Sequence, residues 1–210
     1  MSEQITDQTK DKKKAGYHHG NLREALIASA IEILEGEGLP ALSLRAVARR
    51  AGVSQAAPYH HFKDKTGMLA AIAARGFAEL VKAQKEVTAE TDDVTGRLRA
   101  LGHGYMNFGL NHPALWRLMF GPEIASPAQY PELADVASQS YRLLTDAVAA
   151  QLTPKAVGND ASKAASVAAW ALVHGLTMLV MDGRLSPAFT GVETADQLID
   201  QVTDAFARGF

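Results

Sequence analysis

The chain has 210 residues, of which 47% are hydrophobic, and a formal net charge of −2 at pH 7. Its lack of cysteine excludes disulfides and thiol chemistry. Its polar N-terminus and the absence of an uninterrupted run of about 18 apolar residues argue against a signal peptide or a membrane helix. We therefore expect a soluble, cytoplasmic protein with no membrane partner, long enough for a small module and a larger domain.

The charges are divided unevenly along the chain. Residues 10–75 carry eleven lysines and arginines against six acidic residues, whereas residues 76–210 carry ten against fifteen. This asymmetry indicates that the N-terminal third alone meets nucleic acid. Residues 1–14, with a basic arm of Lys10, Lys12, Lys13 and Lys14, have little to bury and are expected to be disordered off DNA. The arm either follows the DNA or only solubilises the chain, and both alternatives stay open.

A first amphipathic helix is predicted from Asn21, which stands in an N-cap position, to the pair Gly36 and Gly38. Its apolar residues have helical spacing: Leu22, Leu26, Ala30, Ile33 and Leu34. This helix should support the segment that follows.

Residues 43–65 have the pattern of two short helices joined by a tight turn. Ser43 is a good N-cap, Gly52 suits a left-handed helix end, and Ser54 can cap a second helix that Pro58 keeps short. The first helix has one apolar face: Leu44, Val47, Ala48 and Ala51. In a helix-turn-helix the second helix enters the DNA major groove. Its candidate contact surface is Gln55, Ala56, Ala57, Tyr59 and His60.

Basic residues surround this motif, namely Arg45, Arg49, Arg50, Lys63 and Lys65. Such an arrangement suits phosphate neutralisation, which releases counterions from DNA. The alternative is an ordinary αα-corner, which many helical proteins contain.

Only helices are predicted for the rest of the chain, so the expected fold class is all-α. A helix from about Asp64 to Thr88 should link two domains. The helix after it should end at Pro113, where a short helix over residues 114–120 begins. A loop is expected around residues 121–127. Three further helices are expected over about 131–152, 160–181 and 193–208.

The last two of these helices are candidates for a homodimer interface. The first has a row of alanines, and the last has an apolar stripe formed by Ala195, Leu198, Ile199, Val202 and Phe206. Two such helices from each protomer could form a four-helix interface. Alternatively, the last helix only covers its own core.

Aromatic and thioether side chains gather on the C-terminal helices and could line an effector pocket: Tyr105, Phe108, Trp116, Met119, Phe120, Tyr141, Trp170, His174 and Met178. The same residues could equally form a plain core. The helix that ends at Pro113 contains Gly96, Gly102, Gly104 and Gly109, which leave room either for a ligand or for closely packed helices.

Catalysis and metal binding find little support in the sequence. His103 and His112 have no carboxylate at ligand spacing, and the pairs 18–19 and 60–61 point apart on a helix. The rival hypothesis is a small helical enzyme, or a binding protein, that uses the C-terminal pocket; its acid, base or ligand groups are His103, His174, Glu123 and Asp182. Without a nucleophile and base pair, a phosphate loop or a metal motif, we expect no catalytic residue, metal or cofactor.

A family resemblance covers residues 17–208. The stretch Gly52-Val-Ser-Gln-Ala-Ala-Pro-Tyr-His-His-Phe-Lys-Asp-Lys65, preceded by Tyr17-His-His-Gly-Asn-Leu-Arg-Glu-Ala-Leu26, resembles the TetR family of bacterial regulators. Trp170, His174 and Gly175 resemble the signature of one branch of that family.

The resemblance implies an all-α protein with a three-helix DNA-binding module in residues 15–63 and an effector-binding and dimerisation domain in residues 64–210, of which 64–88 is the link. It implies DNA contacts by Ser43, Arg45, Ser54, Gln55, Ala57, Tyr59, His60 and Lys65. Gln55, Ala57 and His60 would face base edges, and Tyr59 and Lys65 would hold phosphates. The implied function is that of a homodimeric regulator on a palindromic operator of double-stranded DNA, a repressor that an unknown small molecule releases. When bound to its operator it would be associated with the nucleoid.

Overall fold

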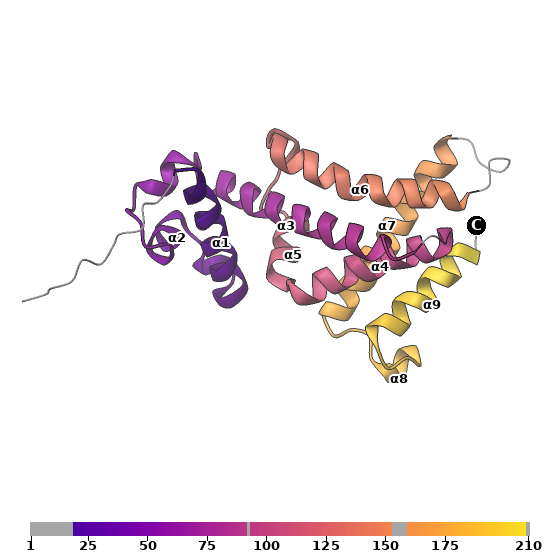
Figure 1. The fold of residues 1–210 in the computed structure, drawn as a ribbon. Coiled ribbons are helices and arrows are strands. Elements are labelled where there is room, and N and C mark those ends of the chain that lie inside the picture. Colours follow the sequence, from indigo (N-terminus) through magenta and orange to yellow (C-terminus); the bar gives the residue numbers. More distant parts are fainter. Residues whose placement is uncertain (1–18, 92, 153–158, 209–210) are drawn as a thin grey trace, which may run out of the picture.

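The computed structural model describes residues 19–91, 93–152 and 159–208, which form helices and their connections without any strand (Figure 1). The all-α prediction is confirmed. The basic arm at residues 1–14 lies outside the described residues, so its contact with DNA stays a prediction. The helices, with the short 3-10 turns marked η, are α1 (His19–Glu37), η1 (Leu39–Ala41), α2 (Leu44–Arg50), η2 (Ala57–His60), α3 (Lys65–Thr88), α4 (Val94–Asn111), α5 (Pro113–Phe120), η3 (Pro127–Gln129), α6 (Pro131–Gln151), α7 (Asn159–Met181), α8 (Pro187–Thr190) and α9 (Ala195–Arg208).

The α1 and α2 helices form a small module at one end of the molecule, and α3 runs from that module into the larger bundle (Figure 1). Asp64 begins α3 as an N-cap, because its side chain accepts a hydrogen bond from the Gly67 amide at 2.8 Å. The α1 helix starts at His19, so the predicted cap at Asn21 is wrong and this residue lies inside the helix. Gly38, with φ of 82°, follows its last residue.

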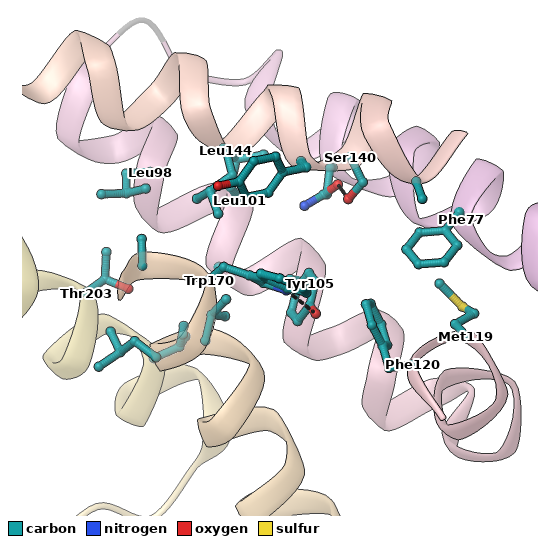
Figure 2. Close-up of a pocket in the computed structure, with 18 of the residues that line it drawn as sticks. Phe77, Leu98, Leu101, Tyr105, Met119, Phe120, Ser140, Leu144, Trp170 and Thr203 are labelled. Carbon is teal, nitrogen blue, oxygen red and sulfur yellow. Dashed lines mark hydrogen bonds between the residues drawn. The ribbon is translucent and has the colours of Figure 1, made fainter. Parts of the chain in front are cut away.

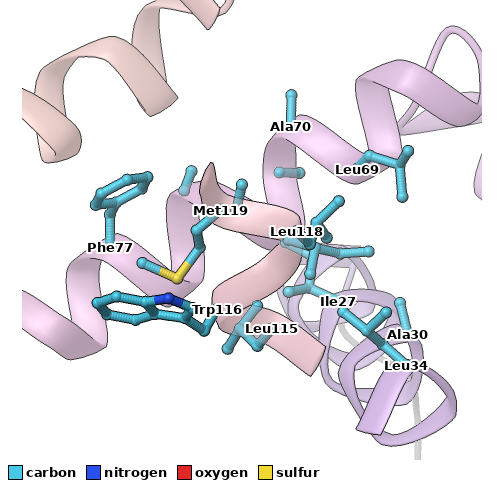
Figure 3. Close-up of a cluster of buried hydrophobic side chains, with 14 of the residues drawn as sticks. Ile27, Ala30, Leu34, Leu69, Ala70, Phe77, Leu115, Trp116, Leu118 and Met119 are labelled. Carbon is cyan, nitrogen blue, oxygen red and sulfur yellow. The ribbon is translucent and has the colours of Figure 1, made fainter. Parts of the chain in front are cut away.

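A continuous hydrophobic core runs from the small module into the larger bundle, and a second, smaller cluster lies between α4, α6 and α7. Figure 3 shows Leu118 of α5 beside Ile27 of α1, while Trp116 and Met119 of α5 turn toward Phe77 of α3. All five side chains belong to the same buried cluster. Packing therefore does not break at residue 64, where the sequence suggested a domain boundary, and both α3 and α5 connect the module to the bundle.

The glycines of α4 allow close helix packing. An added Cβ at Gly104 would lie 3.1 Å from Val87 of α3, and one at Gly109 would lie 2.8 Å from Thr177 of α7. At Gly102 it would meet Ile199 of α9 at 3.1 Å. Of the two explanations that the sequence left open, these distances favour packing, although Gly102 also borders a cavity.

The helices α7 and α9 use their apolar residues differently. The apolar stripe of α9 faces inward: Ile199 is 1% exposed, and Leu198 and Val202 pack against the same core. The α7 helix instead exposes Val167 and Leu179, which are 53% and 44% accessible. Its segment Asp160–Met181 has a mean hydropathy of 1.7, and only about a third of its most apolar stretch is buried. By length and composition alone this segment could cross a bilayer.

Candidate nucleic-acid interface and internal cavity

The turn after α2 has the geometry that the sequence predicts. Ser43 caps α2, since its Oγ accepts a hydrogen bond from the Ala46 amide at 3.1 Å. Gly52 has φ of 68°, and the Val53 amide donates to the Ala48 carbonyl at 3.0 Å. These bonds end α2 sharply and begin the turn that leads to η2, which packs against α2.

The second helix of the predicted helix-turn-helix, here called the recognition segment, is not an α-helix. Ala57–His60 forms a single 3-10 turn, and Ser54 does not act as its side-chain cap. Pro58, buried at the second position of that turn, disfavours α conformation at the residue before it. The predicted short recognition helix is therefore shortened to one turn, which still presents the same side chains on one side of the module.

All but one of the side chains that the resemblance assigns to DNA contact are exposed. Tyr59 is 54% accessible, and Ala57 is the half-buried exception. The exposed residues are Ser43, Arg45, Ser54, Gln55, Tyr59, His60 and Lys65. A half-buried alanine among them leaves room for a close approach of the backbone to a ligand surface.

The module carries basic side chains that no acidic partner neutralises. Arg50 turns back to α1, where it pairs with Glu37 and, at 3.4 Å, with Glu32. Four further cations form no ion pair with any residue in the described part of the chain: Arg45, Arg49, Lys63 and Lys65. Because these four lie around the turn, the module presents uncompensated positive charge beside its exposed polar side chains.

A cavity of about 310 Å³ lies inside the larger bundle, bounded by α3, α4, α5, α6, α7 and α9 (Figure 2). Figure 2 shows Phe77, Met119 and Phe120 at one end of the cavity and Leu98 and Thr203 at the other, so the space is elongated. Five of the predicted pocket residues line it: Tyr105, Met119, Phe120, Tyr141 and Trp170.

The other four predicted pocket residues, Phe108, Trp116, His174 and Met178, do not line the cavity. Trp116 is fully buried behind Tyr105, with ring centroids 4.5 Å apart, and His174 stacks on Trp116 at 5.5 Å. Helical spacing could not separate lining from core residues, because one turn of a helix places both kinds next to each other.

Most of the residues that line the cavity were not predicted from the sequence to do so. They include residues that look like ordinary core aliphatics or polar surface: Phe77, Gln84, Leu98, Leu101, Leu133, Ser140, Leu144, Ile199, Thr203 and Phe206. Three polar residues of the wall are buried in the structure, Gln84, Ser140 and Thr203, at 3%, 7% and 6% exposure. Polar residues are more often exposed, so nothing in the sequence indicated their burial.

Tyr105 carries a small polar network at the cavity wall. Its hydroxyl accepts a hydrogen bond from Trp170 Nε1 at 3.2 Å and lies 2.9 Å from His174 Nδ1. Burial raises the pKa of the Tyr105 hydroxyl far above its ordinary value. Burial also lowers the pKa of His174 below its ordinary 6.5. Both groups are therefore neutral at physiological pH.

The side chains of the rival enzyme hypothesis have separate partners. His103 contacts Asp196 and Asp200 of α9, at 3.1 Å and 2.8 Å, so the carboxylates that sequence spacing did not reveal come from a distant helix. Asp182 pairs with Arg117 at 2.6 Å, whereas His174 bonds Tyr105. Among the described residues no group of three or more histidines and carboxylates is arranged to hold a metal ion.

A carboxylate of the DNA module caps a helix of the cavity wall. Glu35 of α1 accepts hydrogen bonds from the amides of Ala114 and Leu115 at 3.2 Å and 3.0 Å, at the start of α5. Negative charge at a helix N-terminus is favourable. The same short helix carries Met119 and Phe120 into the cavity, so one rigid element contacts both regions.

Comparison with known proteins matches both parts of the chain to one family. Residues 26–72 match the model described as bacterial regulatory proteins, tetR family, and residues 98–206 match that of the tetracyclin repressor-like C-terminal domain. The tetracycline repressor protein class C of Escherichia coli is 47% identical over 51 residues, which are 24% of this chain and 23% of that protein. The transcriptional regulator BetI of Pseudomonas paraeruginosa is 32% identical over 111 residues, covering 50% of this chain and 56% of BetI. The chain thus spans about half the length, or less, of these curated relatives.

Solved structures extend the likeness along the whole chain. A protein of unknown function from Rhodococcus sp. RHA1 is 34% identical, with a TM-score of 0.75 over 94% of this chain and 99% of that one. The fatty acid degradation regulator FadR of Bacillus halodurans, 15% identical with a TM-score of 0.68 over 91% and 97% of the two chains, shows the shared fold alone. Since the C-terminal family model covers half of the chain and the N-terminal model covers the turn described above, this protein belongs to the TetR family of bacterial regulatory proteins.

Proposed function

We propose that the protein is a sequence-specific DNA-binding transcriptional regulator, a repressor that a small molecule releases from a palindromic operator. The observation that carries this proposal is the set of unpaired cations, Arg45, Arg49, Lys63 and Lys65, around an exposed polar turn. Neutralising DNA phosphates requires such charges to be free of protein carboxylates. Family membership supports the same conclusion.

Each exposed side chain has a proposed role. Tyr59 and Lys65 hold phosphates, which positions the module without reading sequence. Gln55 and His60 face base edges, and a glutamine can form two hydrogen bonds with adenine. Ser43 and Arg45 contact the backbone at the start of α2, while Ser54 and Ala57 let the 3-10 turn come close to the groove.

Selection of random duplex DNA on the purified protein tests this proposal and should enrich a palindrome. Tyr59→Phe and Lys65→Ala should weaken binding to all sequences alike, with the Lys65 change reducing the salt slope by about 0.9. Gln55→Ala should instead change which bases are preferred. Lys82→Ala, an exposed cation on α3 far along the helix from the turn, is the matched control and should leave affinity unchanged. Equal effects of Gln55→Ala and Lys65→Ala on preference would contradict these roles.

We also propose that the protein is a homodimer, and that α7 forms the centre of its interface. The outward face of α7 is small and apolar: Ala164, Val167, Ala168, Ala171, Leu172 and Leu179. Small residues allow two helices to approach closely, and a two-fold axis would pair each face with its own copy. The inward stripe of α9 leaves that helix a smaller role than the sequence suggested.

Size exclusion with light scattering measures the oligomeric state. The protein should be dimeric at micromolar concentration, and Ala171→Glu should make it monomeric. Gln201→Glu, on the exposed polar side of α9, is the control and should remain dimeric. A monomer that binds lipid vesicles through α7 would instead favour a bilayer as the partner of this face.

Release from DNA follows from the connection between the cavity and the module. A ligand that prefers one arrangement of α3 and α5 would shift the spacing of the two recognition turns, which face successive grooves about 34 Å apart. Glu35 would pass a movement of α5 to α1. To switch most of the protein, the ligand must favour the released state by roughly 5 kcal/mol. Operator affinity that stays constant while a verified ligand saturates the protein would refute this mechanism for that ligand.

As a regulator the protein acts in the cytoplasm. When it is bound to its operator, it is associated with the nucleoid. The enzyme alternative has little support, because His103, His174 and Asp182 each bond to a different partner rather than to one another.

A further inference from the structure

The cavity wall carries no ionisable side chain other than two tyrosines. Its lining contains no aspartate, glutamate, lysine, arginine or histidine among the residues that the structure describes. A charged molecule in this space would lose its hydration without gaining an ion pair. Burial keeps the Tyr105 hydroxyl in the wall neutral, and it also keeps neutral His174, which lies within hydrogen-bonding distance of that hydroxyl. The wall therefore favours a neutral occupant.

Gln84 brings a hydrogen-bond donor to the cavity wall that no described residue accepts. Gln84 is 3% exposed and borders the cavity, and Ser140 donates a hydrogen bond to its Oε1 at 2.9 Å. No acceptor for the Gln84 amide nitrogen is found among the described residues, and this nitrogen is not one of the fully buried unpaired atoms, so it keeps accessible surface at the cavity wall. A ligand that brings an acceptor oxygen to this nitrogen would gain a hydrogen bond in a mainly apolar space, where few other polar partners are available.

Gln84 lies between the two ends of the cavity wall along its long direction. Phe77 and Phe120 stand at one end and Leu98 at the other, so apolar surface extends on both sides of the polar pair (Figure 2). Ser140, whose hydrogen bond is drawn in the same view, marks the position of that pair. The acceptor of a fitting ligand would thus sit within its length, with apolar groups on either side.

We propose that the cavity binds an uncharged, elongated and mainly apolar molecule whose carbonyl oxygen accepts a hydrogen bond from the Gln84 amide. This inference rests on the proposed role of the cavity as the effector site. It makes Gln84 the residue that selects for a carbonyl, and it makes the absence of charge the feature that rejects organic acids. Trp170 and Tyr141, which are 40% and 37% exposed, border the opening through which such a molecule enters.

Four probes of similar size separate these features: butyrophenone as a neutral ketone, butylbenzene as its hydrocarbon counterpart, 4-phenylbutyrate as an anion, and phenylpropyltrimethylammonium as a cation. Calorimetry on the DNA-free protein should give the tightest binding for the ketone, roughly tenfold tighter than for the hydrocarbon, since one hydrogen bond contributes about 1 kcal/mol. The anion should bind weakest.

Two variants locate the effect. Gln84→Leu should remove the preference for the ketone over the hydrocarbon, whereas Ser140→Ala, which keeps the Gln84 amide, should retain it. Unfolding curves check that both variants are folded. Tightest binding of the anion or of the cation overturns the proposal, as does a ketone preference that survives Gln84→Leu, or no binding of any probe at millimolar concentration. Operator release is measured separately, so a ketone that binds without releasing DNA refutes the regulatory proposal and leaves the ligand assignment intact.

Discussion

Replacing Glu35 tests the connection between the DNA module and the cavity. Its carboxylate accepts two hydrogen bonds, from the amides of Ala114 and Leu115, at the half-buried start of α5. Loss of an N-terminal cap costs about 0.5–2 kcal/mol, and loss of a negative charge at a helix N-terminus costs a further 0.3–1 kcal/mol or so. Glu35→Ala should therefore lower the free energy of unfolding by about 2 kcal/mol. Glu35→Gln keeps an acceptor oxygen and should lose about half as much.

Thermal unfolding is the first assay, and the midpoint of Glu35→Ala should fall by roughly 4–8 °C for a chain of this length. The matched control is Glu86→Ala, because Glu86 is exposed and pairs only with Lys82, at 3.8 Å, which contributes about 0.5 kcal/mol or less. In operator titrations, Glu35→Ala should bind DNA like the wild type without ligand but respond less to ligand. A midpoint shift no larger than that of Glu86→Ala, or an undiminished response to ligand, would show that Glu35 does not connect the two regions.

Two further predictions concern the packing and the buried histidine. Gly109→Ala should destabilise the fold by about 1–3 kcal/mol in urea titrations, because its Cβ would lie 2.8 Å from Thr177 Cγ2 in a close-packed interior. Gly36→Ala has no atom within 4 Å of the new Cβ and should instead raise the free energy of unfolding by up to about 1 kcal/mol. A loss of stability in both variants would disprove the packing argument. Because burial lowers the pKa of His174, the unfolded chain binds its proton first, so stability should be lost as the pH falls below about 6.5. Between pH 7.5 and 5, His174→Gln should lose less stability than the wild type. An equal loss in the two proteins would show that protonation of His174 is not the cause.

Helix positions were largely predictable from the sequence because their signals are local. The cap at Asp64, the proline at Pro113 and the glycine at Gly52 each change the conformation of the residues beside them, and the structure has helix ends at all three. The exceptions have local causes too. Pro58 reduced the recognition segment to a 3-10 turn, and α1 began before the residue chosen as its cap.

The candidate site was predictable only in part. Exposure of Gln55, Tyr59 and Lys65 follows from their polar character on a small module, and the structure places all three at its surface. Which residues line the cavity cannot be predicted from residue type in the same way. Trp116 and Trp170 have the same side chain, yet Trp116 is fully buried in the core and Trp170 borders the cavity. The difference depends on the angle at which neighbouring helices meet, which no local pattern specifies.

The sequence alone determined the helices, the basic turn and the division of charge, because capping, glycine conformation and net charge depend on residues close together in the chain. Only the tertiary structure decided which cations are free, which face of α9 is buried, and that Glu35 reaches across to α5. It also decided that Gln84 and Ser140, 56 positions apart, form a polar pair inside an apolar cavity. Such contacts arise from helix packing between distant segments, and packing energy depends on the shape of the whole interface rather than on any one stretch of sequence.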